Sequence, residues 1–219
     1  MLGFNQFLSI KEAYLIESAN PVSVDVYHGS GKLFRKFDQQ NARIPNDFYG
    51  GGQGYFTDHK GVGTQYAKAM SKYHKTNTPY LYHTTLKMNN VFDVDHHFTG
   101  DKLKHVLPDD PKHHEDFARG AGLLHVGADK YDVLAKLKSG SLKLTGKQVF
   151  NGLSGGVNTA KAREHLIKKG YDGLRYNGGE NMEAVKHNVY IPYNASSIKI
   201  NKISKIVKPA NKDQSETKV

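Results

Sequence analysis

The stretch GQGYFTDHKGVGTQYAKAMSKYHK, residues 52–75, decides the expected fold. Its residues 55–57 (YFT) are aromatic or β-branched, which is typical of a short strand. Asp58 follows them and is expected to cap a helix over about 60–74, because its carboxylate can accept a hydrogen bond from a free N–H of the first turn. The stretch therefore predicts a strand that passes directly into a helix.

Strand patterns continue on both sides of this stretch. Residues 22–27 (VSVDVY) alternate and are rich in β-branched residues, so they predict a strand that ends at His28. Residues 157–169 predict an amphipathic helix with Asn158 or Thr159 near its cap. Further strands are expected over residues 79–86, 90–94, 173–176, 187–193 and 196–203.

The interval 95–156 has a different character. It is rich in charged residues and histidines, and its weakly helical segments, 129–138 and 146–153, are broken by glycines. We expect this interval to be a helical insertion that packs on the sheet of a single domain spanning residues 1–206.

The two ends of the chain complete this organisation. Residues 1–18 predict a short amphipathic helix and lack the basic start and cleavage site of a secretory signal. Residues 207–219 are polar and charged, and they predict a disordered tail. No apolar run approaches the about 20 residues of a membrane-spanning helix. We therefore expect a cytoplasmic protein with no membrane partner.

The composition limits the possible chemistry. The chain has 219 residues, of which 37% are apolar and 24% charged, as expected for one compact domain that mixes helices and strands. The absence of cysteine excludes disulfides, thiolate metal ligands and a cysteine nucleophile. The net charge of +10 predicts a surface that attracts anions, which permits a nucleic-acid target without establishing one.

Three short motifs carry the functional prediction. Residues 27–30 (YHGS) end the first expected strand. Residues 52–58 (GQGYFTD) are followed, eight residues after Asp58, by Tyr66-Ala67 on the expected helix. Residues 170–176 (GYDGLRY) precede the late strand, which contains the sequence VYIPYNASSI. Each motif is unspecific alone, but the three in this order are more specific.

In this order the motifs resemble the ADP-ribosyltransferases of the His-Tyr-Glu type, the group that contains diphtheria toxin and the poly(ADP-ribose) polymerases. The versions carried by bacteriophages and mobile elements are the most similar, and the resemblance covers about residues 22–85 and 157–203. It implies an α+β fold in which two packed, mostly antiparallel sheets form a split cleft for NAD⁺. It also implies a phage or toxin-like effector that splits NAD⁺ and transfers ADP-ribose to a protein or a nucleic acid.

The resemblance assigns roles to residues of the first two motifs. His28 is expected to hydrogen-bond a ribose hydroxyl on the adenosine side of NAD⁺, and the Gly29 backbone to hold the carboxamide. Tyr55 and Tyr66 are expected to sandwich the nicotinamide, since aromatic faces suit a planar, cationic ring. Candidates for the diphosphate side are Ser30, Arg35 and Arg43.

The family places a glutamate at the start of the late strand, where it stabilises the positive charge that develops on the ribose. Val189 occupies this position and cannot do so. Glu183 on the preceding loop is the favoured replacement as a catalytic residue, and Glu180 is the second choice. Asn188 or His187 can instead bind the ribose hydroxyls without a charge. Loss of the strand glutamate favours a single transfer over chain elongation, so we expect mono-ADP-ribosylation.

Three other functions stay open. A non-catalytic module that binds NAD⁺ or ADP-ribose is supported by Val189. A relative of the same fold that removes a 2′-phosphate from RNA needs a constellation rich in arginine and histidine, and tyrosines stand at the matching positions. A structural component of a phage particle has no direct support in the sequence.

A cluster of histidines and acidic residues in the insertion is chemically suited to zinc. No HExxH or similar ligand spacing occurs in it, so a solvated charged surface is the expected role and no metal is expected. The residues concerned are His96, His97, His105, His113, His114, His125, Asp93, Asp95, Asp109, Asp110 and Glu115.

Overall fold

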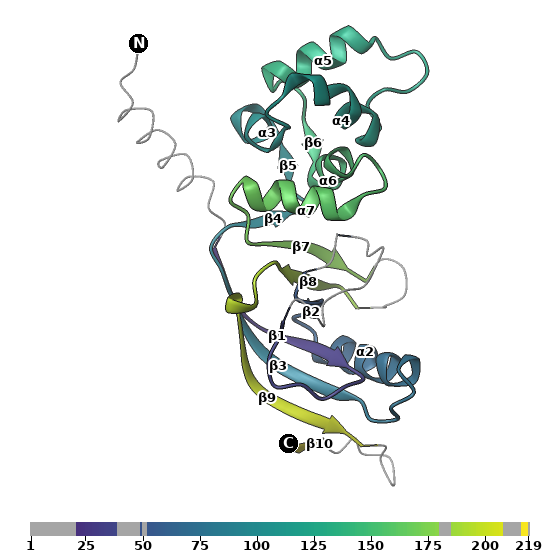
Figure 1. Cartoon of the computed structure of the whole chain (residues 1–219), viewed down its shortest axis with the longest axis vertical. Helices are drawn as coiled ribbons and strands as arrows, with labels where there is room; N and C mark the ends of the chain where they lie inside the picture. Colours follow the sequence, from purple (N-terminus) through teal and green to yellow (C-terminus); the bar gives the residue numbers. More distant parts are fainter. Residues whose placement is uncertain (1–20, 39–48, 50–51, 180–184, 208–215, 219) are drawn as a thin grey trace, which may run out of the picture. The chain divides into compact units, whose positions relative to one another are not determined.

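The computed structural model describes residues 21–38, 49, 52–179, 185–207 and 216–218. The chain divides into two compact units, coloured along the sequence in Figure 1. The helical unit contains Asn89–Asp172, and the sheet unit contains Val22–Pro45, Gly51–Met88 and Gly173–Val219. Helices and strands both contribute to the structure, which confirms the α+β class.

The sheet unit is built on antiparallel strands in the spatial order β10-β9-β3-β1-β2-β8-β7. The longest pairing runs without a break from Val22↔Met88 to Ser30↔Tyr80, between β1 and β3. The strands are β1 (Val22–Ser30), β2 (Phe56–Thr57), β3 (Tyr80–Met88), β7 (Gly173–Gly178), β8 (His187–Pro192), β9 (Ile198–Ile206) and β10 (Glu216–Lys218). A short 3₁₀ helix, η2 (Ala195–Ser197), precedes β9.

One hydrogen-bonded sheet thus replaces the two packed sheets that were expected. The link is β2, which pairs with β1 on one side through Tyr27↔Thr57 and with β8 on the other through Phe56↔Tyr190 and Thr57↔Val189. Thr57 has a partner on both sides, whereas Phe56 has one in β8 only. The strand expected at 55–57 is therefore confirmed and occupies the centre of the sheet.

Helix α2 (Lys60–Tyr73) packs against β1 at backbone contact distance. A Cβ on Gly29 would lie only 2.3 Å from the Ala67 nitrogen and 2.3 Å from the Gly63 oxygen, and one on Gly63 would lie 2.8 Å from the Tyr27 Cβ. No side chain fits at these crossings, which explains the glycines in both segments.

The helix begins as expected, but its cap is His59, whose Nδ1 accepts from the Val62 N–H at 3.3 Å. The expected cap, Asp58, is engaged elsewhere.

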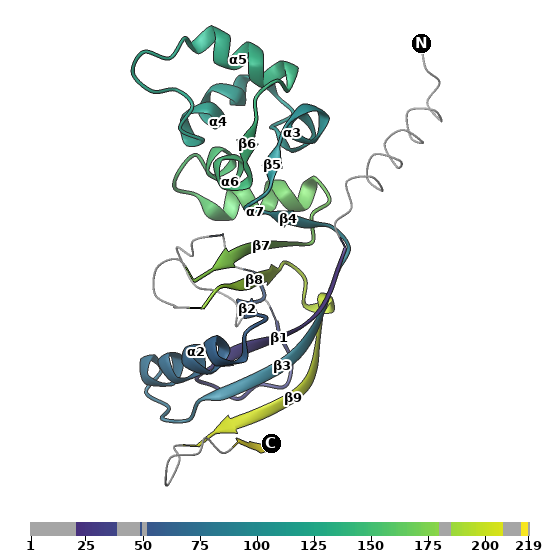
Figure 2. The same cartoon turned by 180° about the vertical axis from the view of Figure 1, so that it is seen from behind.

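The helical unit surrounds a core of large apolar side chains that include Phe92, Leu103, Phe117, Leu137 and Phe150. Its two short strands, β5 and β6, pair through His97↔Thr145 and Phe98↔Leu144. In chain order its elements, seen from behind in Figure 2, are β4 (Val91–Asp93), β5 (His97–Phe98), α3 (Gly100–Val106), η1 (Pro111–His113), α4 (His114–Gly120), α5 (Lys130–Ser139), β6 (Leu144–Thr145), α6 (Gly146–Ser154) and α7 (Thr159–Lys168).

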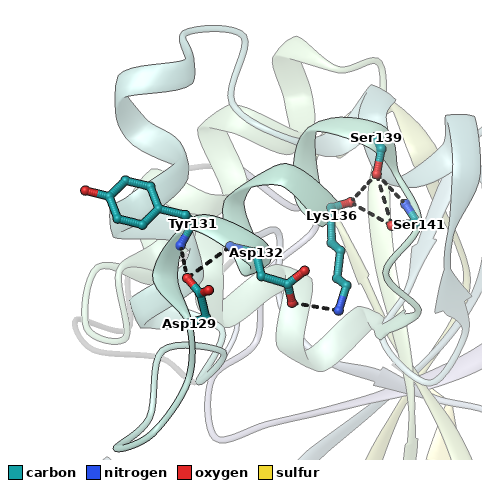
Figure 3. Close-up of polar contacts among 6 residues, drawn as sticks. All are labelled: Asp129, Tyr131, Asp132, Lys136, Ser139 and Ser141. Carbon is teal, nitrogen blue, oxygen red and sulfur yellow. Dashed lines mark hydrogen bonds and ion pairs between the residues drawn. The ribbon is translucent and has the colours of Figure 1, made fainter.

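Local contacts define helix α5 at both ends (Figure 3). The Asp129 carboxylate accepts from the N–H groups of Tyr131 at 2.9 Å and Asp132 at 3.3 Å, which satisfies two free donors of the first turn. Lys136 pairs with Asp132 one turn earlier, at 2.7 Å. The helix ends at Gly140, whose φ of 73° is the left-handed conformation that glycine adopts most easily.

The helical segments expected within the insertion are confirmed as α5 and α6, and the helix expected over 157–169 is α7. Asn158 is its cap and accepts from the Lys161 N–H at 3.0 Å. The compact unit extends beyond the interval 95–156 at both ends.

The tail was expected to be disordered, but Glu216–Lys218 form a strand that pairs with β9. The edge of β9 offers free backbone groups for this pairing. The helix expected over 1–18 lies outside the described residues.

Candidate functional site

His28 lies near the end of β1, and its ring is surrounded by aromatic side chains. The ring centroids of Phe37, Phe56 and Tyr82 lie 5.3, 5.1 and 5.9 Å from that of His28. Phe34 lies 6.1 Å away. Burial in these surroundings lowers the pKa of His28 from its usual 6.5 to about 4, so the imidazole is neutral at pH 7.

The hydrogen bond of His28 defines which nitrogen can meet a ligand. Its Nδ1 lies 2.9 Å from the carbonyl oxygen of Tyr55. A carbonyl oxygen only accepts, so Nδ1 carries the proton and Nε2 of the neutral ring is a hydrogen-bond acceptor. A ribose hydroxyl is a suitable donor to that nitrogen. The positioning role expected for His28 stays a prediction.

The loop after β1 is held beside His28 by Tyr82. The Tyr82 hydroxyl accepts from the Phe34 N–H at 2.7 Å, and it lies within donating distance of the carbonyl oxygens of Lys32, at 3.2 Å, and Phe34, at 3.1 Å. The Phe34 and Tyr82 rings stack at 4.3 Å. The sequence motifs gave no indication of these aromatic neighbours, because Phe34 and Phe37 lie in a segment without a regular pattern.

The residues before β2 approach His28 from the other side. Gly54 has a φ of +123°, and a Cβ there would lie 3.1 Å from the His28 Cε1, so only glycine fits this position well. Gln53 is 4% exposed, and its N–H donates to the Pro192 oxygen at 2.9 Å. Its Oε1 has no hydrogen-bond partner in the described part of the chain, which makes it an additional candidate for ligand contact.

The residues expected to clamp the nicotinamide lie on three segments. Tyr55 is bound to His28 through its carbonyl. Gly29 is in backbone contact with α2 at Tyr66, whose side chain is 50% exposed, and α2 packs on the face of β1 that bears Tyr27 and Gly29. The joint action of these residues on nicotinamide stays a prediction. The Ser30 hydroxyl forms a local turn with the backbone of Lys32 at 2.9 and 3.0 Å.

Asp58, which the sequence analysis expected to cap a helix, is bound at the start of β8. The Asn188 N–H donates to the Asp58 Oδ1 at 2.9 Å, and the Asn188 Nδ2 donates to Oδ2 at 2.6 Å. Asp58 is therefore not a helix cap but one half of a cross-strand pair, next to buried Val189, which is 7% exposed. The His187 ring binds the Val185 oxygen at 2.9 Å. Glu180, Glu183 and Arg43 lie outside the described residues.

Two histidines of the insertion and one of α7 bind backbone carbonyl groups. The Nε2 atoms of His105, His114 and His165 lie 2.9 to 3.1 Å from the carbonyl oxygens of Lys169, Pro108 and Val106, respectively. Within the described ranges, no group of three or more histidine, aspartate or glutamate side chains is arranged to hold a metal ion. None of the described helices is long and apolar enough to cross a membrane.

Comparison with known proteins adds no further constraint. No family model, no curated protein and no solved structure matches this chain. The functional argument therefore depends on the motifs and on the geometry around His28.

The low pKa of His28 predicts a loss of stability in acid. Between pH 6.5 and pH 4 the unfolded chain binds a proton that the folded chain excludes, so the free energy of unfolding falls as the pH falls. We expect the contribution of His28 to fall by about 2 kcal/mol between pH 7 and pH 4.5. Urea unfolding of the native protein and of His28→Phe at both pH values isolates the contribution of His28 to the free energy of unfolding, since every other group is common to the two proteins. An equal pH dependence in both would contradict the buried, neutral ring.

Proposed function

We propose that this protein is a mono-ADP-ribosyltransferase that uses NAD⁺ as a substrate and modifies a protein or a nucleic acid. The observation that supports the proposal is the neutral His28, fixed by Tyr55 with its Nε2 as the acceptor and followed directly by Gly29, as in the resembling motif. A role as a phage or toxin-like effector follows from the resemblance of the motifs alone.

The proposed reaction breaks the bond between the nicotinamide nitrogen and the ribose carbon. Nicotinamide leaves as a neutral molecule with the bonding electrons, and positive charge develops on the ribose. A nucleophile of the target then bonds to the ribose carbon and loses its proton to solvent. His28 orients the dinucleotide through a ribose hydroxyl, and Tyr55 and Tyr66 hold the nicotinamide ring. Positioning of this kind can supply much of the rate.

Asp58 is our candidate for the carboxylate that Val189 cannot provide. Its two oxygens are oriented by Asn188 at the start of β8, and each keeps a lone pair for another contact. A fixed carboxylate stabilises positive charge on the ribose as it develops. Glu183 remains the alternative on the preceding loop.

The variant Asp58→Asn is expected to lower kcat by about a hundredfold and to change KM little, because the charge acts mainly on the transition state. The measurement is the initial rate of nicotinamide release at several NAD⁺ concentrations. Asp25→Asn is the matched control, since Asp25 is also exposed and bound to one partner, the Thr85 hydroxyl. A rate equal to that of the control would transfer the role to Glu183, which Glu183→Ala then tests.

The proposal itself is tested with NAD⁺ labelled in its adenylate phosphate and incubated with the purified protein and a cell lysate. Transfer predicts labelled macromolecules together with one nicotinamide released for each label. Digestion of the products with ribonuclease, deoxyribonuclease or protease identifies the class of the target. Neither label nor nicotinamide in any lysate would overturn the proposal.

A second function is favoured by one observation. Val189 is buried in β8 at the position where the resembling family carries its glutamate. A module that binds NAD⁺ or ADP-ribose without splitting it needs no carboxylate there. Calorimetric titration with NAD⁺ separates the two functions, because binding without nicotinamide release supports only the module.

A further inference from the structure

A small hollow in the sheet unit lies apart from the candidate site. Its volume is about 110 Å³, and it is lined by Tyr27, Lys60, Leu81, His83, Lys202 and Ser204. Tyr27 and His28 are neighbours in a regular strand, so their side chains project from opposite faces of the sheet. The hollow is therefore on the other face from the His28 ring.

The strand register explains how these residues meet. Tyr27 pairs with His83 across β1 and β3, and His83 pairs with Lys202 across β3 and β9. The next row on the same face contains Ser204, because residues two apart in a strand share a face. One row thus places an aromatic ring, an imidazole and an ammonium group side by side. Lys60, the first residue of α2, adds a second ammonium group.

The lining is suited to an anion. It contains two lysines and no acidic residue. Asp25, two residues before Tyr27 on the same face, is bound to the Thr85 hydroxyl at 2.5 Å. Lys202 forms no ion pair with any described residue. Lys202 therefore offers an anion in the hollow a positive charge that no described acidic residue pairs with.

Ser204 adds a neutral hydrogen-bonding group to the hollow. The residue is only 3% exposed and contributes to the lining. A hydroxyl can donate one hydrogen bond and accept others. A phosphate oxygen in the hollow would accept the hydroxyl proton.

The two aromatic rings that line the hollow favour one kind of anion, a nucleic acid. The Tyr27 and His83 rings stack, with centroids 5.2 Å apart and an angle of 19° between their planes. Sites for single-stranded nucleic acid combine lysines for the backbone with aromatic rings for the bases. The volume of about 110 Å³ leaves room for one phosphate group.

We propose that this hollow binds a backbone phosphate of a single-stranded nucleic acid, held by Lys60, Lys202 and Ser204, with an adjoining base against the Tyr27–His83 pair. The nucleic acid thus binds on the face of the sheet opposite His28. This inference does not depend on ADP-ribose transfer, because binding is measured without NAD⁺.

The test uses the full chain and fluorescent oligonucleotides of about twelve nucleotides, as single-stranded RNA, single-stranded DNA and duplex DNA. Anisotropy gives the dissociation constant at several salt concentrations. Lys202→Gln is expected to weaken single-strand binding about tenfold at low salt and to reduce the slope of log K against log salt by about one. Ser204→Ala, which keeps the lysines, is expected to weaken binding by a smaller factor.

Lys205→Gln is the matched control, since Lys205 is exposed on the same strand, carries the same charge and does not line the hollow. It is expected to leave the affinity within about twofold. Equal losses in Lys202→Gln and Lys205→Gln would show diffuse attraction to a basic surface and overturn the site. Equal affinity for duplex and single strands, or tighter binding of a phosphopeptide or of anionic vesicles, would overturn the assignment to single-stranded nucleic acid.

Discussion

His28→Ala is expected to reduce ADP-ribose transfer and nicotinamide release by at least about a hundredfold, because the loss of a positioning contact misaligns the bond that breaks. The variant removes the acceptor Nε2 and the donor to the Tyr55 carbonyl at once. Label transfer and nicotinamide release, measured at saturating NAD⁺, check this result.

Two further variants separate the loss of function from a loss of structure. His28→Phe keeps a ring in the aromatic surroundings of Phe37, Phe56 and Tyr82 but removes both nitrogens, so it is expected to fold and to be as inactive as His28→Ala. His74→Ala changes an exposed histidine at the end of α2 and is expected to be fully active. An active His28→Phe would exclude the assigned site.

Gly29→Ala is expected to lower the free energy of unfolding by about 3 kcal/mol or more. The added Cβ would lie 2.3 Å from two backbone atoms of α2, and backbone atoms cannot rotate away as a side chain does. The helix must move outward, which opens the packing of Ala67 and Leu81 beneath it. Far-ultraviolet circular dichroism during urea unfolding measures the effect.

Gly61→Ala provides the control for this prediction. Gly61 lies in the first turn of α2, and its Cβ would approach only the ring of His59, at 3.0 Å from Cε1. The His59 ring, which caps α2, must shift slightly, and the better helix propensity of alanine, about 1 kcal/mol, offsets the weakened cap, so the stability is expected to change little. A Gly29→Ala protein as stable as Gly61→Ala would contradict the close crossing of β1 and α2.

The elements of the sheet unit were predictable because local patterns determine them. β1, α2 and β8 coincide with the expected segments to within a few residues. The helix cap was not predictable, because Asp58 and His59 can both accept from the first turn. Asn188, 130 residues further along the chain, binds Asp58 and leaves the cap position to His59. A sequence pattern over a few residues does not contain such a distant partner.

The candidate site was predictable in part. The sequence indicated His28, Gly29, Tyr55 and Tyr66 as a group, and the structure joins His28 to Tyr55 and Gly29 to the backbone of α2, while their role in binding NAD⁺ stays a prediction. It could not indicate that the His28 ring is neutral, because the pKa depends on the desolvation imposed by Phe37 and its neighbours. Nor could it indicate that the Ser30 hydroxyl forms a local turn with the Lys32 backbone, and the assignment of Ser30 to the diphosphate stays a prediction.

The shortness of β2 restricts how this sequence can change in length. Since β2 has only two residues, one inserted residue would exchange the faces of Phe56 and Thr57, because strand side chains alternate. The same insertion would separate Asp58 from Asn188 and Gly54 from the His28 ring. Loops elsewhere tolerate insertions and deletions. Among natural variants of this protein, the length of the segment 53–59 is therefore expected to be constant.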